Sequence, residues 1–135
     1  MSKAYAFVSN NSVQALTSGA NVSPGTAQHG FGGCACGYII QVSGNNINLR
    51  APGYYNINIG ATVTDSVAGN VTLALYQDGV MVAQGSENIA DVTNPASIAF
   101  PAGVKVNCNS TLTLIVTSSA GDPSVNNIYI TVAKQ

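Results

Sequence analysis

Strict alternation of apolar and polar residues over Tyr54–Thr64 is the feature that most constrains how this chain folds. The positions of one face are all apolar: Tyr55, Ile57, Ile59, Ala61 and Val63. Between them stand Tyr54 and a series of Asn, Gly and Thr residues. A period of two is typical of a strand with one buried face, as in antiparallel sheets. The pattern therefore predicts a long, half-buried antiparallel strand.

A tight hairpin is predicted immediately downstream. Val71–Gln77 and Val80–Gln84 are separated only by Asp78-Gly79, a strong signal for a two-residue type I′ turn. Such a turn sets the strand register. The predicted facing pairs are Gln77 with Val80, Tyr76 with Met81, and Leu75 with Val82. The residues predicted to face the core are Val71, Leu73, Leu75, Val80 and Val82.

Shorter alternating segments indicate more strands, at residues 38–42, 47–49, 98–100, 104–106, 111–117 and 127–133. Pro101 lacks a backbone N–H, so we expect it at a strand end or on an edge strand. No window of a dozen residues has a helical period. Eight or more strands without helices predict an all-β sandwich or closed barrel.

The first 37 residues have a different character. Two short strands, 4–8 and 13–16, precede a glycine-rich stretch, 17–37, without apolar periodicity. We interpret residues 1–37 as an extended arm that contributes at most an edge strand, and residues 38–135 as the folded domain. The alternative is that the segment packs along the domain's own sheet.

Composition excludes several classes of function. Hydrophobic residues make up 46% of the chain and charged residues only 7%, with four Lys and Arg against five Asp and Glu. These charges cannot form the basic patch of a nucleic-acid-binding protein. The hydrophobic content is too high for a disordered chain. No stretch is long enough to span a membrane, and no secretory signal is visible. The three cysteines do not suggest a secreted disulfide framework, so we expect synthesis in a reducing cytoplasm.

The segment Ile47–Ile59 resembles the entry into the central strand of C1q/TNF-like jelly rolls, through Pro52-Gly53 followed by Tyr55. Further landmarks occur in the family's order: the hairpin, Phe100–Val106, Leu112–Leu114 and the terminal strand Ile128–Val132. The resemblance covers residues 38–135. It implies a ten-stranded jelly roll that assembles as a homotrimer. Small, charge-poor versions resemble spore-surface or virion-surface components of Gram-positive bacteria and their phages.

Large, partly apolar side chains are expected to point outward from several strands. They are Tyr54, Tyr76, Met81 and Tyr129. Aromatic residues and Met are enriched in interface cores, so these four are the candidate residues of the trimer interface. The alternative is that each is an isolated exposed apolar residue, which is normal on a protein surface.

One cluster carries soft metal ligands, namely His29, Cys34 and Cys36, with Cys108 as a further candidate. These could bind Zn²⁺, but structural zinc sites usually place two residues between cysteines, and here there is one. A disulfide and inert, packed thiols are the alternatives. The five acids are scattered, and nothing supplies an orienting group for a Cys/His dyad. We expect no catalytic residue, no metal and no cofactor.

The sequence hypothesis is thus a structural virion protein. It would be a trimeric decoration (cement) protein on the outer surface of a phage capsid, made in the host bacterial cytoplasm. Residues 1–37 would contact the major capsid protein lattice, with no nucleic-acid or membrane partner. The alternatives are a receptor- or glycan-binding tip of a phage fibre, and a bacterial spore-surface (exosporium-type) component.

Overall fold

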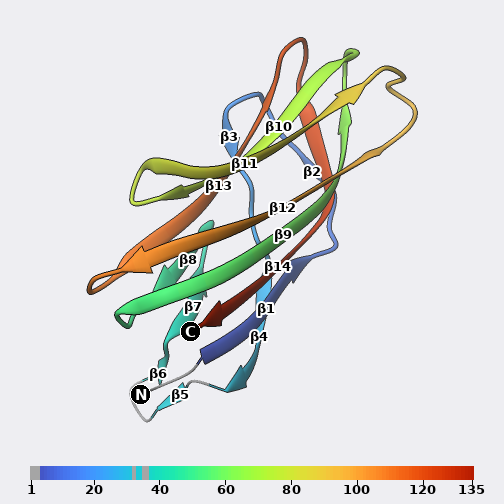
Figure 1. The fold of residues 1–135 in the computed structure, drawn as a ribbon. Coiled ribbons are helices and arrows are strands. Elements are labelled where there is room, and N and C mark those ends of the chain that lie inside the picture. Colours follow the sequence, from blue (N-terminus) through green and yellow to red (C-terminus); the bar gives the residue numbers. More distant parts are fainter. Residues whose placement is uncertain (1–3, 32, 35–36) are drawn as a thin grey trace.

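Two antiparallel β-sheets pack face to face in the computed structural model, which describes residues 4–31, 33–34 and 37–135 (Figure 1). Every regular element of these residues is a β-strand. The described residues form fourteen strands, of which four are two-residue pairings and ten are longer. The prediction of an all-β sandwich of jelly-roll type is confirmed. None of the described segments forms a helix that could cross a membrane.

Sheet A contains the longest strand, and its outer face is one broad side of the molecule. Its strand order is β12 (Ala96–Val106), β9 (Gly53–Asp65), β14 (Pro123–Lys134), β1 (Ala4–Asn10) and β4 (Thr26–Phe31). The short β2 (Gln14–Ala15) also pairs with β14.

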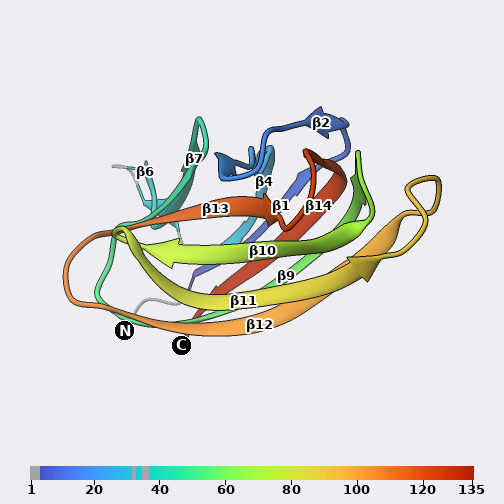
Figure 2. The same cartoon turned by 90° about the horizontal axis from the view of Figure 1, so that it is seen from above.

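Sheet B forms the second layer. Its order is β11 (Val80–Ile89), β10 (Gly69–Gln77), β13 (Ser110–Ser118), β8 (Asn46–Leu49) and β7 (Ile40–Ser43), with β3 (Ala20–Asn21) also paired to β13. A separate two-stranded ribbon joins β5 (Gly33–Cys34) to β6 (Gly37–Tyr38). The edge strands β11 and β12 run side by side along one flank (Figure 2).

The core lies between the sheets, as the alternation predicts. On β9 the five predicted positions are all buried: Tyr55, Ile57, Ile59, Ala61 and Val63. They pack with apolar residues from both sheets into one cluster. Because successive side chains of a strand point to opposite faces, the even-numbered residues 54–64 of β9 point outward from sheet A.

The Asp78-Gly79 turn is confirmed, but the hairpin register contains a bulge. Both turn residues have positive φ, 52° at Asp78 and 86° at Gly79, as a type I′ turn requires. Gln77 pairs with Val80 and Tyr76 with Met81, as predicted, whereas Leu75 pairs with Ala83. The predicted Leu75–Val82 pair is wrong because an extra residue on β11 shifts the register there.

The bulge also changes which residues of β11 reach the core. Ala83 packs against the core cluster, while Val80 and Val82 are exposed. The prediction that both valines face the core is therefore wrong. Val80, 66% exposed, lies at the hairpin tip beside the turn, and the shift at Val82 brings Ala83 opposite the buried Leu75.

Pro101 lies within β12, which is one continuous strand rather than two short ones. Among the described strands, β12 pairs with β9 alone, so Pro101 is on an edge strand as predicted. At an edge, one row of N–H groups has no strand partner. A proline in that row, which has no N–H, therefore removes no hydrogen bond between strands.

The boundary predicted after residue 37 does not coincide with a structural boundary. Strand β1 lies inside sheet A, between β14 and β4, and its Ala4, Ala6 and Val8 are buried in the core. Residues 4–31 thus pack along the domain's own sheets, which is the alternative to an arm. Short apolar side chains on β1 fill the core without the long alternation that makes β9 recognisable.

Candidate assembly surface

The outer face of sheet A is built by cross-strand rows of side chains. One row runs from Ser9 on β1 through Tyr129 on β14 and Gly60 on β9 to Ala99 on β12. The adjacent row on the same face contains Phe7, Thr131, Asn58 and Pro101. Residues in register across strands share one face, so these small, amide and aromatic groups form one continuous surface.

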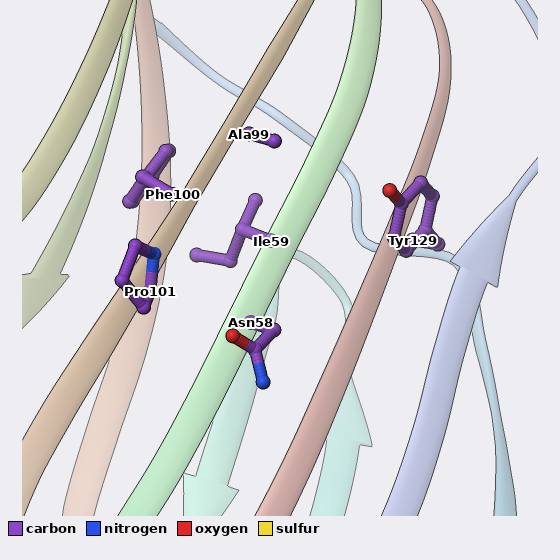
Figure 3. A pocket seen from close by; sticks show the side chains of 6 residues that line it. All are labelled: Asn58, Ile59, Ala99, Phe100, Pro101 and Tyr129. Carbon is purple, nitrogen blue, oxygen red and sulfur yellow. The ribbon is translucent and has the colours of Figure 1, made fainter.

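Tyr129 lies flat over Gly60 because Gly60 has no side chain. A Cβ added at Gly60 would lie 2.1 Å from Cζ of the Tyr129 ring. The ring forms one wall of a shallow hollow of about 330 Å³, whose other outward-facing residues are Asn58, Ala99 and Pro101 (Figure 3). Tyr129 is still 47% exposed, so the folded chain positions the ring without covering it.

This face is almost free of charge. Among the described residues of its strands, Lys105 is the exposed charged residue, since Asp65 and Lys134 are buried. The Lys105 ammonium lies 5.9 Å from the ring centroid of Tyr54, close enough for a cation–π contact. Tyr54 is 61% exposed. The face thus combines exposed aromatic rings with little charge, the composition typical of an interface core.

The four predicted interface residues do not lie together. Tyr54 and Tyr129 share the outer face of sheet A, on the neighbouring strands β9 and β14. Tyr76 and Met81 face each other across β10 and β11 in sheet B. Met81 is exposed and Tyr76 is half-buried. Alternation shows that each side chain points outward, but it does not show which sheet a strand joins.

Two aromatic residues of this surface were missed by sequence reasoning. Phe7 and the exposed Tyr5 lie on β1 and alternate with the buried Ala4, Ala6 and Val8. Their outward positions place them in register with Thr131 and Ala133 of β14. The alternation over residues 4–8 is the sequence signal that marks both as outward, whereas the interpretation of residues 1–37 as an arm does not place them on this surface.

The candidate metal ligands are partly outside the described residues. Cys36 is outside them, and of Cys34 only the backbone is described. The His29 ring stacks on Tyr38 with centroids 3.6 Å apart, and its Nε2 lies 2.7 Å from the Ile40 carbonyl oxygen. No three His, Cys, Asp or Glu side chains in the described part of the chain gather closely enough to hold a metal.

Cys108 is an exposed free thiol in the loop between β12 and β13. His29 lies on β4, at the opposite edge of sheet A, four strand spacings or about 19 Å from β12. The topology therefore separates Cys108 from His29.

Three of the five acids stabilise turns and strand ends. Asp65 is buried and accepts a hydrogen bond from the Ser118 hydroxyl. Asp78 accepts from the Ser110 hydroxyl and the Thr111 amide. Hydrogen bonds from the Thr93 backbone and side chain hold the pKa of Asp91 below its ordinary value. These carboxylates have structural partners, and none of them faces the hollow beside Tyr129.

No protein-family model matches this chain, and no curated protein matches it in sequence. Solved structures do share its fold. Eiger TNF from S. frugiperda is 14% identical with a TM-score of 0.71, over 98% of this chain and 91% of that chain. The globular domain of zebrafish complement 1qA is 10% identical with a TM-score of 0.68, over 95% and 94%. The fold is therefore the C1q/TNF-like jelly roll, as the Pro52-Gly53 segment and the later landmarks predicted.

The same fold also occurs in a phage protein. The PRD1 vertex protein P5 is 17% identical to this chain, with a TM-score of 0.63 over 99% of this chain and 98% of that chain. The similarity thus extends over nearly the whole length of both chains.

Proposed function

We propose that this chain is a structural protein of a virion surface that assembles as a homotrimer through the outer face of sheet A. The observation that carries the proposal is the exposed, nearly uncharged face on which Tyr129 lies across Gly60. Rigid aromatic rings supply much contact area at little entropic cost, and among the described residues of this face Lys105 is the exposed charge that would have to be desolvated. The similarity of fold to the PRD1 vertex protein P5 supports a virion role.

A three-fold contact is heterologous, so the face of one protomer meets a different surface of the next. Tyr54 and Tyr129 belong to the sheet A face. Tyr5 and Phe7 extend the same face and join the interface in this proposal. Tyr76 and Met81, on sheet B, lie outside this face.

The more specific role we propose is decoration (cement) of the outer surface of a phage capsid. Residues 11–21 carry no charge, and most of them are exposed. Within the 1–37 segment, we assign the contact with the capsid lattice to this stretch. A trimer that binds only the assembled lattice stabilises it by mass action, by about 2.7 kcal/mol at a free concentration one hundred times Kd.

The assembly step is tested by native mass spectrometry and sedimentation. We expect the wild-type chain to have the mass of three protomers. Tyr129→Ser removes the central ring and should yield monomers at the same concentration. Tyr76→Ser, the matched control on the opposite sheet, should remain trimeric. A monomeric wild type refutes the trimer, and a trimeric Tyr129→Ser protein refutes this interface.

The capsid role is tested separately by cosedimentation with empty capsids and with dispersed capsid protein. Binding to capsids alone, with a raised capsid melting temperature, is the expected result for a cement protein. Detection of the protein in spores and not in purified virions would instead support the spore-surface alternative.

A further inference from the structure

A second hollow, of about 360 Å³, lies on sheet B where β7, β8 and β13 meet. Most of its lining residues are polar: Gln41, Asn48, Leu49, Arg50, Asn109, Ser110 and Thr111. Sheet B is the layer opposite the proposed trimer face. Its volume is at the lower end of the range for small-molecule sites.

A row of hydrogen-bonding side chains crosses three strands at this hollow. Gln41 pairs with Asn48, and Asn48 pairs with Thr111, so the three side chains share one face. The Thr111 hydroxyl donates to Oδ1 of Asn48 over 3.2 Å. This bond orients the Asn48 amide and leaves its nitrogen, with two donors, for a ligand. Amides and hydroxyls that both donate and accept are suited to the hydroxyl groups of a sugar.

The single arginine of the chain, Arg50, stands in the same lining. Its side chain is exposed, and no carboxylate pairs with it among the residues that the structure describes. The backbone beneath it is held at two points. The Arg50 amide donates to the Ile39 carbonyl over 2.8 Å, and the Tyr55 hydroxyl donates to the carbonyl of the next residue, Ala51, over 2.8 Å.

The local charge favours an anion. None of the lining residues is acidic. The carboxylate of Asp78 already has partners in this network, since its two oxygens accept from the Ser110 hydroxyl and the Thr111 amide. A guanidinium binds a carboxylate through two parallel hydrogen bonds, a geometry that no other cation in this chain can provide.

We propose that this hollow binds a carboxylated sugar, a single acidic unit of a surface glycan. In this arrangement Arg50 holds the carboxylate, and the row of Gln41, Asn48 and Thr111 binds ring hydroxyls. The site lies within one protomer, so it does not depend on assembly. A trimer would present three such sites, and linked sites raise the avidity for a polyvalent glycan well above the affinity of one.

The test is an NMR titration of the ¹⁵N-labelled chain with glucuronic acid, N-acetylneuraminic acid and glucose. We expect millimolar binding of at least one acid, with shifts confined to the backbone amides near residues 41, 48–50 and 109–111. Glucose should bind much more weakly. The acid that binds more tightly distinguishes a uronic from a sialic source.

Arg50→Gln should weaken binding of the acid about tenfold or more, because a hydrogen-bonded ion pair is lost. Arg50→Lys should be intermediate, since it keeps the charge without the planar fork. Lys105→Gln removes one positive charge from another part of the surface and should bind like wild type. Absence of shifts with both acids, equal binding of glucose, or an equal loss in Lys105→Gln each overturns the proposal. The titration is repeated on the Tyr129→Ser protein. Because the site lies within one protomer, this variant should bind the acid like wild type, whatever the outcome of the assembly test.

Discussion

At the scale of single residues, Tyr55 explains why the Pro52-Gly53 segment precedes the central strand. Its ring is buried in the core, and its hydroxyl donates to the Ala51 carbonyl, which closes the bend before β9. Gly53, with φ of 145°, allows the Lys134 side chain to pass 3.1 Å from where a Cβ would stand. A phenol and a glycine thus fix the direction in which β9 enters the sandwich.

Burial raises the pKa of Tyr55 above its ordinary value of 10.0. The native state therefore holds this proton at a pH where the unfolded chain loses it, and stability declines as pH rises above about 10. Below that pH the contribution is fully present, because both states are protonated. Tyr55→Phe should lose about 1 kcal/mol at neutral pH, the value of one hydrogen bond. Its stability should then decline less steeply above pH 10 than that of wild type.

Urea unfolding at a series of pH values measures both effects. Tyr54→Phe is the matched control, since Tyr54 is the exposed neighbour. It should show the wild-type alkaline slope. Equal slopes in wild type and Tyr55→Phe would contradict the role of the buried phenol.

At the scale of elements, β1 and β4 are joined by a connection that depends on Gly25. This glycine has φ of 96°, and a Cβ there would lie 1.9 Å from the Ser9 carbonyl oxygen of β1. Backbone atoms cannot move aside as a flexible side chain can. The close approach holds the start of β4 against the end of β1.

Substitution of two glycines tests whether this segment is integral to the fold. Gly19 has a similar φ, 92°, but nothing lies within 4 Å of its missing Cβ. Gly19→Ala should cost about 1–2 kcal/mol through backbone strain alone. Gly25→Ala should cost about 1–3 kcal/mol more, because the methyl group overlaps Ser9. Chemical denaturation of both variants measures the difference. Equal losses would contradict the close packing, and would fit a segment that is an arm.

The strands that sequence predicted best are those with long alternation, β9 above all, because only a strand buried on one face keeps a period of two. The bulge at Val82 could not be predicted in this way. Asp78-Gly79 determines only the pairs beside the turn, and the register shifts beyond Tyr76. The same limit applies to the candidate site. Alternation marked Tyr54, Tyr76, Met81 and Tyr129 as outward, but their division between two sheets follows from long-range pairing.

At the scale of the whole molecule, scarcity of charge is the property that distinguishes this chain. A net charge of −1 and 7% charged residues give little electrostatic repulsion between copies. The outer face of sheet A adds exposed rings with Lys105 at its margin. A surface of this kind favours association, and the attraction is hydrophobic rather than ionic.

The stability of the proposed trimer should therefore depend little on salt. Between about 0.1 and 1 M NaCl the Debye length falls from about 10 to 3 Å, which would weaken an interface held by exposed ion pairs. An apolar interface does not weaken under these conditions, and sulfate should tighten it because sulfate strengthens apolar burial. We expect the trimer dissociation constant, measured by sedimentation equilibrium, to change by less than about threefold in NaCl and to fall in sodium sulfate. Lys105→Gln should behave like wild type. A loss of about tenfold or more in NaCl that Lys105→Gln abolishes would show instead that Lys105 forms an ion pair across the interface.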